Sequence, residues 1–307
     1  MNRQTYLGIS LALGTAVISG ASNFIAKIGV TVVNNGVVFT ALKNSLVAGA
    51  LIGIILLLKR LPELRKLSHK DWAKLAAIGV VGGGVPFVLF FTGLTHTTAL
   101  TAGVIHKTLF FWVALLAARF LKERIGRAQT VAFFFLIGGN FVLGGLRGLT
   151  FGAGERMILA ATIFWAIENV IAKRALNNIP SLVVAGARMT FGSVILFAVV
   201  GLQGNFHLIG SLDARQWLWT LIPSALLLGY VLTWYSALRR LSATFATCLL
   251  VPATFVTGLL SQVFLDKSLT ANDLMSGAVV LAACGVLMYG AYHSTKYAVP
   301  SSQRADA

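Results

Sequence analysis

Charged residues are scarce in this 307-residue sequence: they make up 11% of it, whereas 57% of the residues are hydrophobic. Soluble domains carry about 25% charged residues, so this composition excludes an ordinary water-soluble globule. Acidic residues are the scarcest, with 9 Asp and Glu against 25 Lys and Arg. The resulting charge of +16 could suggest nucleic-acid binding, but the basic residues lie in short clusters between apolar runs. The composition therefore predicts a membrane protein with several spans.

Cysteines are few, and the common enzyme motifs are missing. Cys248 and Cys284 both lie in apolar runs, which excludes a disulfide framework and gives no metal-ligand spacing. The sequence has no glycine-rich loop ending in Lys-Ser or Lys-Thr, no His-Glu-x-x-His and no serine nucleophile elbow. We therefore expect no ATP drive, no metal, no cofactor and no enzymatic activity.

Ten apolar stretches are long enough to cross a bilayer, whose hydrocarbon core requires roughly 20 helical residues. The connections between them are short, so consecutive helices must run antiparallel. The first stretch is too long for the apolar core of a signal peptide, and we expect it to be retained. The predicted fold is an all-α integral membrane protein with spans at 5–30, 37–58, 72–94, 98–121, 127–147, 156–177, 181–201, 216–238, 242–265 and 271–293.

The distribution of Lys and Arg predicts how these helices are oriented. With the N-terminus in the cytoplasm, seventeen basic residues fall in cytoplasmic segments and four in the opposite loops. Both termini are therefore expected in the cytoplasm, with the chain in a bacterial inner (plasma) membrane. The positive charge is mostly a topology signal, which removes the main support for nucleic-acid binding.

The sequence also repeats itself at offsets of 144 to 146 residues. The run Asn-Phe-Ile-Ala-Lys at 23–27, for example, returns as Asn-Val-Ile-Ala-Lys at 169–173. We therefore expect two homologous five-helix repeats, at 1–148 and 149–296, followed by a disordered cytoplasmic tail at 297–307. Because five is odd, the second repeat enters the membrane inverted. Secondary transporters often have such inverted repeats, with the substrate site near the bilayer midplane.

Two helix ends carry a family resemblance. The run Phe-Leu-Lys-Glu-Arg at 120–124 ends the fourth span, and Leu-Val-Pro at 250–252 lies early in its second-repeat counterpart. With the duplicated five-helix unit, these signatures resemble the ten-helix EamA-type members of the drug/metabolite transporter superfamily over essentially the whole chain. Two positions depart from the pattern, since Lys267 replaces the usual second glutamate and Thr108 the usual first proline. The resemblance implies an inner-membrane exporter of amino acids and other small metabolites, and the exporters of aromatic amino acids are the most similar branch.

Ionisable residues within the spans need a partner or water, because each costs at least ~2.5–3.5 kcal/mol at the bilayer centre. Lys43 and Arg188 lie only roughly 10 Å deep and Lys27 can reach an interface, which leaves Lys107 and Glu168 near the midplane. These two residues either pair to lock the bundle or face the transport pathway and meet a charged substrate or a proton. The sequence leaves both open.

Candidate proton couplers, if transport is coupled, are His106 and Glu168. A histidine can exchange a proton near neutral pH, and a carboxyl group in a dry setting can carry one. The alternative for His106 is a structural hydrogen bond to a backbone carbonyl.

Polar and aromatic residues near the midplane predict the substrate site. Trp165, Glu168 and Asn169 share one helix face at i, i+3 and i+4, and Asn23 is the first-repeat counterpart of Asn169. These asparagines either line a cavity or only bond neighbouring helices, and most aromatics on apolar helices serve in packing. An aromatic pocket with few polar anchors would suit a flat amphipathic ligand such as an aromatic amino acid. The predicted substrate-binding residues are Asn23, Phe87, His106, Lys107, Phe110, Trp165, Glu168, Asn169, Tyr230 and Trp234.

Glycine and proline interrupt two of the predicted spans. Gly82, Gly83, Gly84 and Pro86 fall within the third span, and Pro252 falls within the ninth. Such interruptions open backbone carbonyls where they face a cavity. We expect a bend beside the substrate site at 82–86 and a hinge at Pro252.

These features predict a secondary transporter that exports small organic metabolites, foremost amino acids, by alternating access of the two halves. Its partners would be a small-molecule substrate and the lipid bilayer, without nucleic acid, and we expect a monomer. Two alternatives stay open: a membrane-embedded transferase-type enzyme and a membrane scaffold that transports nothing. The enzyme would need clustered acidic or His residues at a membrane surface, whereas the acids here are scattered.

Overall fold

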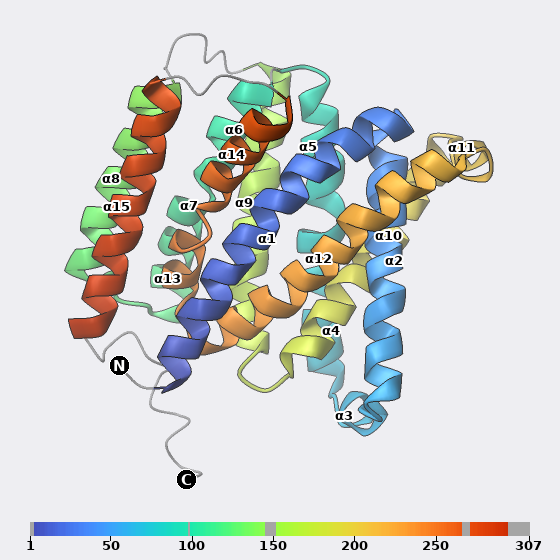
Figure 1. The fold of residues 1–307 in the computed structure, drawn as a ribbon. Coiled ribbons are helices and arrows are strands. Elements are labelled where there is room, and N and C mark those ends of the chain that lie inside the picture. Colours follow the sequence, from blue (N-terminus) through green and yellow to red (C-terminus); the bar gives the residue numbers. More distant parts are fainter. Residues whose placement is uncertain (1–2, 98, 145–151, 266–270, 294–307) are drawn as a thin grey trace.

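The protein is a bundle of helices, seen in a computed structural model that describes residues 3–97, 99–144, 152–265 and 271–293 (Figure 1). Each of the ten predicted spans is occupied by helix. The helices are α1 (Arg3–Val33), α2 (Gly36–Leu57), α4 (His69–Ile78) with η1 (Gly79–Gly84) and α5 (Val85–Leu94), α6 (Ala99–Lys107) with α7 (Leu109–Leu116) and η2 (Ala117–Leu121), α8 (Arg127–Gly144), α9 (Ala153–Ala175), α10 (Ser181–Leu202), α12 (Ala214–Arg240), α13 (Ala243–Cys248) with α14 (Ala253–Leu265), and α15 (Ala271–His293). Two short helices, α3 (Leu61–Arg65) and α11 (Phe206–Gly210), lie in loops. The predicted tail at 297–307 is outside the described residues.

The apolar helices have the length that a bilayer demands. Among the described residues, six helical stretches are long and apolar enough to cross a membrane. They are Arg3–Val33, Gly36–Leu57, His69–Leu94, Thr101–Leu121, Ser181–Leu202 and Ala214–Arg240. Shorter apolar helices, Phe255–Phe264 and Gly277–Gly290, occupy the ninth and tenth predicted spans. The predicted all-α membrane fold is confirmed.

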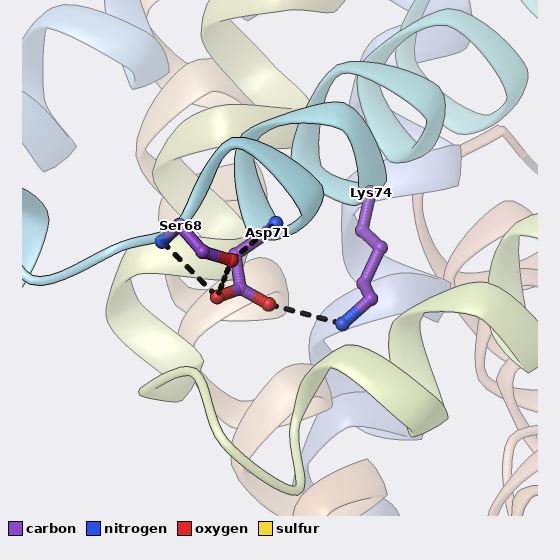
Figure 2. A network of polar contacts seen from close by, with 3 residues as sticks. All are labelled: Ser68, Asp71 and Lys74. Carbon is purple, nitrogen blue, oxygen red and sulfur yellow. Dashed lines mark hydrogen bonds and ion pairs between the residues drawn. The ribbon is translucent and has the colours of Figure 1, made fainter.

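Polar side chains cap several of the helices where they begin. In the capping box of α4, the Ser68 hydroxyl accepts from the Asp71 backbone N–H at 3.2 Å, and the Asp71 carboxylate accepts from the Ser68 backbone N–H at 3.2 Å (Figure 2). The Asp71 carboxylate also accepts from Lys74 at 3.0 Å. Asn35 caps α2, and Asp213 caps α12 with a second capping box. These caps satisfy backbone N–H groups that a helix leaves free in its first turn.

The spans pack in pairs that bring distant parts of the sequence together. α1 packs along α12, α5 along α9, α2 along α10, and α8 along α15. Figure 1 shows α8 and α15 side by side at one edge of the bundle and α2 beside α10 near the other. α1 begins and α15 ends at the end of the bundle where α3 lies, opposite α11 (Figure 1).

The glycine run in the third span forms a π-helix. η1 lies between α4 and α5, and Pro86 follows in the first turn of α5. A Cβ atom on Gly82 would overlap the Glu168 side chain, and one on Gly83 would overlap the backbone of Arg188 and Gly192. The absence of side chains therefore lets η1 approach both α9 and α10 more closely than ordinary residues would.

The predicted interruption of the ninth span is also present. α13 ends at Cys248, turns occupy 249–252, and α14 begins directly after Pro252. Proline has no backbone N–H to continue the helical ladder, so a helix ending before it and a helix beginning after it follow from its chemistry. Whether Pro252 acts as a hinge stays a prediction, as does the same role for 82–86.

Ser68→Ala should destabilise the protein through the α4 cap. We expect a loss of about 1 kcal/mol in unfolding free energy, because one first-turn N–H loses its acceptor. Thermal unfolding of the purified protein in detergent measures the effect. Lys74→Ala is the control, since it removes only the exposed ion pair to Asp71 and should cost less than about 0.5 kcal/mol. Equal melting temperatures for the two variants would contradict this assignment.

Candidate functional site

A buried pair of opposite charges lies between two helices of the bundle. Glu168 of α9 and Arg188 of α10 are 2% and 7% exposed. Arg188 Nε lies 3.9 Å from Glu168 Oε1, and the Tyr235 hydroxyl of α12 donates to the same oxygen at 2.6 Å. Removing one partner of such a pair would leave an uncompensated charge in a medium that cannot hydrate it, at a cost of about 3–5 kcal/mol. The pair therefore constrains how α9, α10 and α12 can pack.

The three residues lie at similar depth. Glu168 and Arg188 are each seven residues from the nearer end of their helices, at Ala175 and Ser181, which corresponds to roughly 10 Å. Tyr235 is five residues from the end of α12, or roughly 8 Å. The expectation that Glu168 lies deeper in its span than Arg188 is wrong, because both residues are equally far from a helix end.

The Gly82 carbonyl of η1 joins this pair to an aromatic residue. It accepts from the Trp165 indole N–H at 3.0 Å and from Arg188 Nη2 at 3.1 Å. A π-helix departs from the α-helical hydrogen-bonding ladder, and such segments are frequent at functional sites because their carbonyls can turn to other partners. The π-helix η1 thus supplies a backbone acceptor to both a cation and an indole.

Aromatic rings surround Trp165. Its ring centroid lies 4.8 Å from that of His106, 5.3 Å from that of Phe87 and 5.7 Å from that of Phe90. The His106 and Phe90 centroids are 5.7 Å apart. Edge-to-face and tilted geometries of this kind add about 0.5–1.5 kcal/mol per pair to the burial energy. The residues come from α5, α6 and α9, so the cluster holds three helices together.

A second aromatic pair lies on α12. Tyr230 and Trp234 stack at 6.4 Å with an interplanar angle of 15°, as their i, i+4 spacing predicts. Tyr230 lies within electrostatic reach of both Arg188 and Glu168. The charged pair is therefore bordered by aromatic residues from α9 and from α12.

Three buried polar atoms near this pair lack a hydrogen-bond partner among the described residues. They are Arg188 Nε, His106 Nδ1 and Asn169 Oδ1. The Asn169 amide donates to the Trp165 carbonyl at 2.9 Å, so only its oxygen is unpaired. A buried polar group without a partner costs about 1–3 kcal/mol. Such atoms commonly mark a place where water or a ligand completes the bonding.

Several predicted residues lie apart from this constellation. Asn23 is exposed on α1, so it does not join Asn169 in one polar face. The Phe110 ring is 2% exposed and stacks on Phe133 of α8 at 5.5 Å, in the hydrophobic core. Lys107 is the partly buried last residue of α6. Of the two alternatives left open for Lys107 and Glu168, the structure gives Glu168 a different cation, Arg188 of α10.

The sequence interpretation missed Arg188, Tyr235 and Phe90. Arg188 had one available signal, since it occupies the repeat position of Lys43 and two cations at equivalent span positions invite a search for an anion. Tyr235 and Phe90 are aromatic residues on apolar helices, a pattern that does not separate binding residues from packing residues.

At the end of the bundle that carries the predicted cytoplasmic loops, polar contacts connect the two predicted repeats. The Glu123 carboxylate accepts from the Ala243 N–H at 2.7 Å, and from the N–H and hydroxyl of Thr244 at 3.1 and 2.8 Å. It therefore caps α13, where a helix carries partial positive charge. Arg174 of the second repeat donates in turn to the Phe120 carbonyl of the first. Glu123 belongs to the 120–124 signature, which thus has a structural role.

Lys173 supports the same end of the bundle. Its ammonium donates to the Leu238 and Arg239 carbonyls at 2.8 and 3.2 Å, at the C-terminus of α12. Cations stabilise helix C-termini through the unpaired carbonyls there.

A multi-spanning helical bundle with a charged pair and aromatic rings joined deep between its spans has the architecture of a membrane transporter. The model of the EamA-like transporter family matches residues 6–145 and, a second time, residues 152–289. The chain belongs to this family, as the helix-end signatures predicted. Its family is one of transporters rather than enzymes.

Similar proteins agree with this assignment. The chain is 25% identical to an uncharacterized transporter of Archaeoglobus fulgidus, over 83% of this chain and 94% of that protein. It is 26% identical to an uncharacterized transporter of Synechocystis, over 85% and 80%. A solved crystal structure superposes with a TM-score of 0.74 at 19% identity, covering 93% of this chain and 99% of the other. At this low identity, the crystal structure shows only that the two chains share a fold.

Gly82→Ala should destabilise the protein, because the new methyl group overlaps the Glu168 side chain. Overpacking of this kind costs about 1–3 kcal/mol. Gly14→Ala on α1 is the control, since a Cβ atom there meets nothing within 4 Å and alanine favours helix. Thermal unfolding in detergent compares the two. Equal melting temperatures for the Gly82→Ala and Gly14→Ala proteins would show that η1 does not need a glycine at position 82.

Proposed function

We propose that this protein is a secondary transporter that exports small organic metabolites, foremost amino acids, across the bacterial inner membrane. The observation that carries the proposal is the Gly82 carbonyl, which holds a charged side chain and an indole together at one place deep in the bundle. Charged and aromatic groups side by side match a small molecule that has a charged end and an apolar body. An aromatic side chain fits best, because four aromatic rings meet there.

The transport mechanism in this proposal is alternating access of two inverted repeats, 1–148 and 149–296. The family model matches twice, once within each of these ranges. The packing of the helices also supports this mechanism. The repeat counterpart of α1 is α9, and that of α12 is the third span, which ends with α5. Exchanging the counterparts therefore turns the α1–α12 pair into the α9–α5 pair. It leaves the α2–α10 and α8–α15 pairs unchanged, as a twofold relation requires. The cytoplasmic placement of both termini rests on the Lys and Arg distribution.

The contacts of Glu123 and Arg174, which join the two repeats, would keep the cytoplasmic end closed. Glu123 lies in the first repeat and α13 in the second, so an opening of this end must separate the carboxylate from the helix it caps. Hydrogen bonds to a charged group contribute about 1.5–3 kcal/mol each. We propose that their rupture is part of each transport cycle, with Pro252 and η1 as the flexible points.

Counterflow into proteoliposomes tests the proposed function. Liposomes that hold the purified protein and unlabelled L-phenylalanine should accumulate labelled L-phenylalanine, whereas empty liposomes should not. Trp165→Ala should reduce the apparent affinity about tenfold or more, because an aromatic contact and its buried area are lost. Phe134→Ala is the matched control, since Phe134 is 74% exposed on α8. Failure of a panel of amino acids and related metabolites to exchange would refute transport and favour a membrane scaffold.

Glu123→Gln should open the cytoplasmic end, because the amide keeps one acceptor oxygen and turns an N–H group toward the α13 donors. Cys248 of α13 reports the opening: it is buried, and in a Cys284→Ala background it is the only cysteine of the chain. We expect a water-soluble maleimide to label Cys248 about tenfold faster in the Glu123→Gln protein. Lys122→Gln, a change at the adjacent exposed residue, is the control. Equal labelling rates in both variants would contradict the closing role.

A further inference from the structure

The buried charges of Glu168 and Arg188 are close but incompletely bonded. Their 3.9 Å separation is longer than a hydrogen bond, although both side chains are more than nine-tenths buried. Arg188 Nε has no hydrogen-bond partner among the described residues, while Nη2 is held by the Gly82 carbonyl. A guanidinium fixed at one nitrogen and free at another is oriented to receive a further acceptor.

Glu168 is held in a complementary way. The hydrogen bond that the described residues give its carboxylate comes from Tyr235 and engages Oε1. An ionised carboxylate accepts at two oxygens, so Oε2 is available to another donor. The unpaired Asn169 Oδ1 on the next residue offers a second acceptor.

We propose that this pair is the recognition site for an α-amino acid zwitterion, with Arg188 binding its carboxylate and Glu168 its ammonium group. The inference rests on the proposed function and specifies how the substrate is chosen. The ammonium and carboxylate groups of the substrate are attached to the same carbon atom. Their charges therefore lie close together, as the opposite charges of Arg188 and Glu168 do. The substrate side chain would then lie against Trp165, because Trp165 and Arg188 share the Gly82 carbonyl.

Other small molecules fit the pair less well. A monocarboxylate would satisfy Arg188 but place a second anion beside Glu168, and an amine would place a second cation beside Arg188. Two like charges in contact repel strongly in a site that excludes water. Of these three kinds of molecule, only the zwitterion keeps the site neutral while it completes the bonding of Arg188 Nε. The pair thus selects by repulsion as well as by attraction.

Competition in the counterflow assay tests this inference with three probes of the same shape: L-phenylalanine, phenethylamine, which lacks the carboxylate, and 3-phenylpropanoate, which lacks the ammonium group. In the unchanged protein, L-phenylalanine should compete at least about tenfold better than either analogue. Arg188→Met should reverse the preference toward phenethylamine, and Glu168→Gln should shift it toward 3-phenylpropanoate. Lys27→Met, which removes an exposed cation from α1, should leave the preference unchanged.

Arg188→Lys provides a milder variant for the case that the Met variant does not fold. Lysine keeps the charge but lacks the planar fork, so we expect weaker binding with the preference for the zwitterion retained. Ligand-induced shifts in melting temperature, measured with the same three probes, give a reading that is independent of transport. The inference would be overturned if the variants lost affinity for all three probes by the same factor. It would also be overturned if they kept the preference of the unchanged protein. Absence of any amino-acid exchange by the unchanged protein would instead refute the proposed function.

Discussion

The ion pair between Glu168 and Arg188 is the constraint on which the interior of this protein depends. Hydrocarbon cannot hydrate either charge, so each needs partners supplied by the protein. Tyr235 supplies one hydrogen bond and the Gly82 carbonyl another, which ties α9, α10, α12 and η1 to one point. The same carbonyl positions Trp165 and, through it, the aromatic cluster. Packing and recognition therefore share one set of atoms.

The close approach of η1 follows from this constraint. A carbonyl of the third span can reach Trp165 and Arg188 only if the backbone comes close to α9 and α10, and Gly82 and Gly83 leave the space. The π-helical turn then frees the carbonyl from the α-helical pattern. The sequence predicted a bend at 82–86. In the structure the Gly82 backbone carbonyl there is a hydrogen-bond acceptor for side chains. Irregular backbone also occurs in other membrane proteins where it is surrounded by protein.

Much of the fold was predictable because the bilayer reduces it to a one-dimensional problem. Every span must satisfy its own backbone and match one thickness, so apolar length alone located the ten helices, with α9 recognised despite Glu155 and Arg156 at its start. Breaks were also local in origin: Pro252 cannot continue a helix, and the glycine run around Gly82 weakens one. The site was only partly predictable. Glu168 and Trp165 were found because a buried acid and a midplane indole are unusual, whereas the burial of Phe110 against Phe133 depends on which helix lies opposite.

Sequence by itself determined the membrane class, the approximate positions of the apolar helical spans, the family and one partner of the ion pair, because each follows from residue chemistry read along the chain. Tertiary structure decided which cation meets Glu168, which carbonyl anchors Trp165 and which helix Glu123 caps. Those choices join segments separated by 20 to 121 residues. They follow from how helices are rotated and packed against each other, and hydropathy along a single helix carries no information about its neighbours.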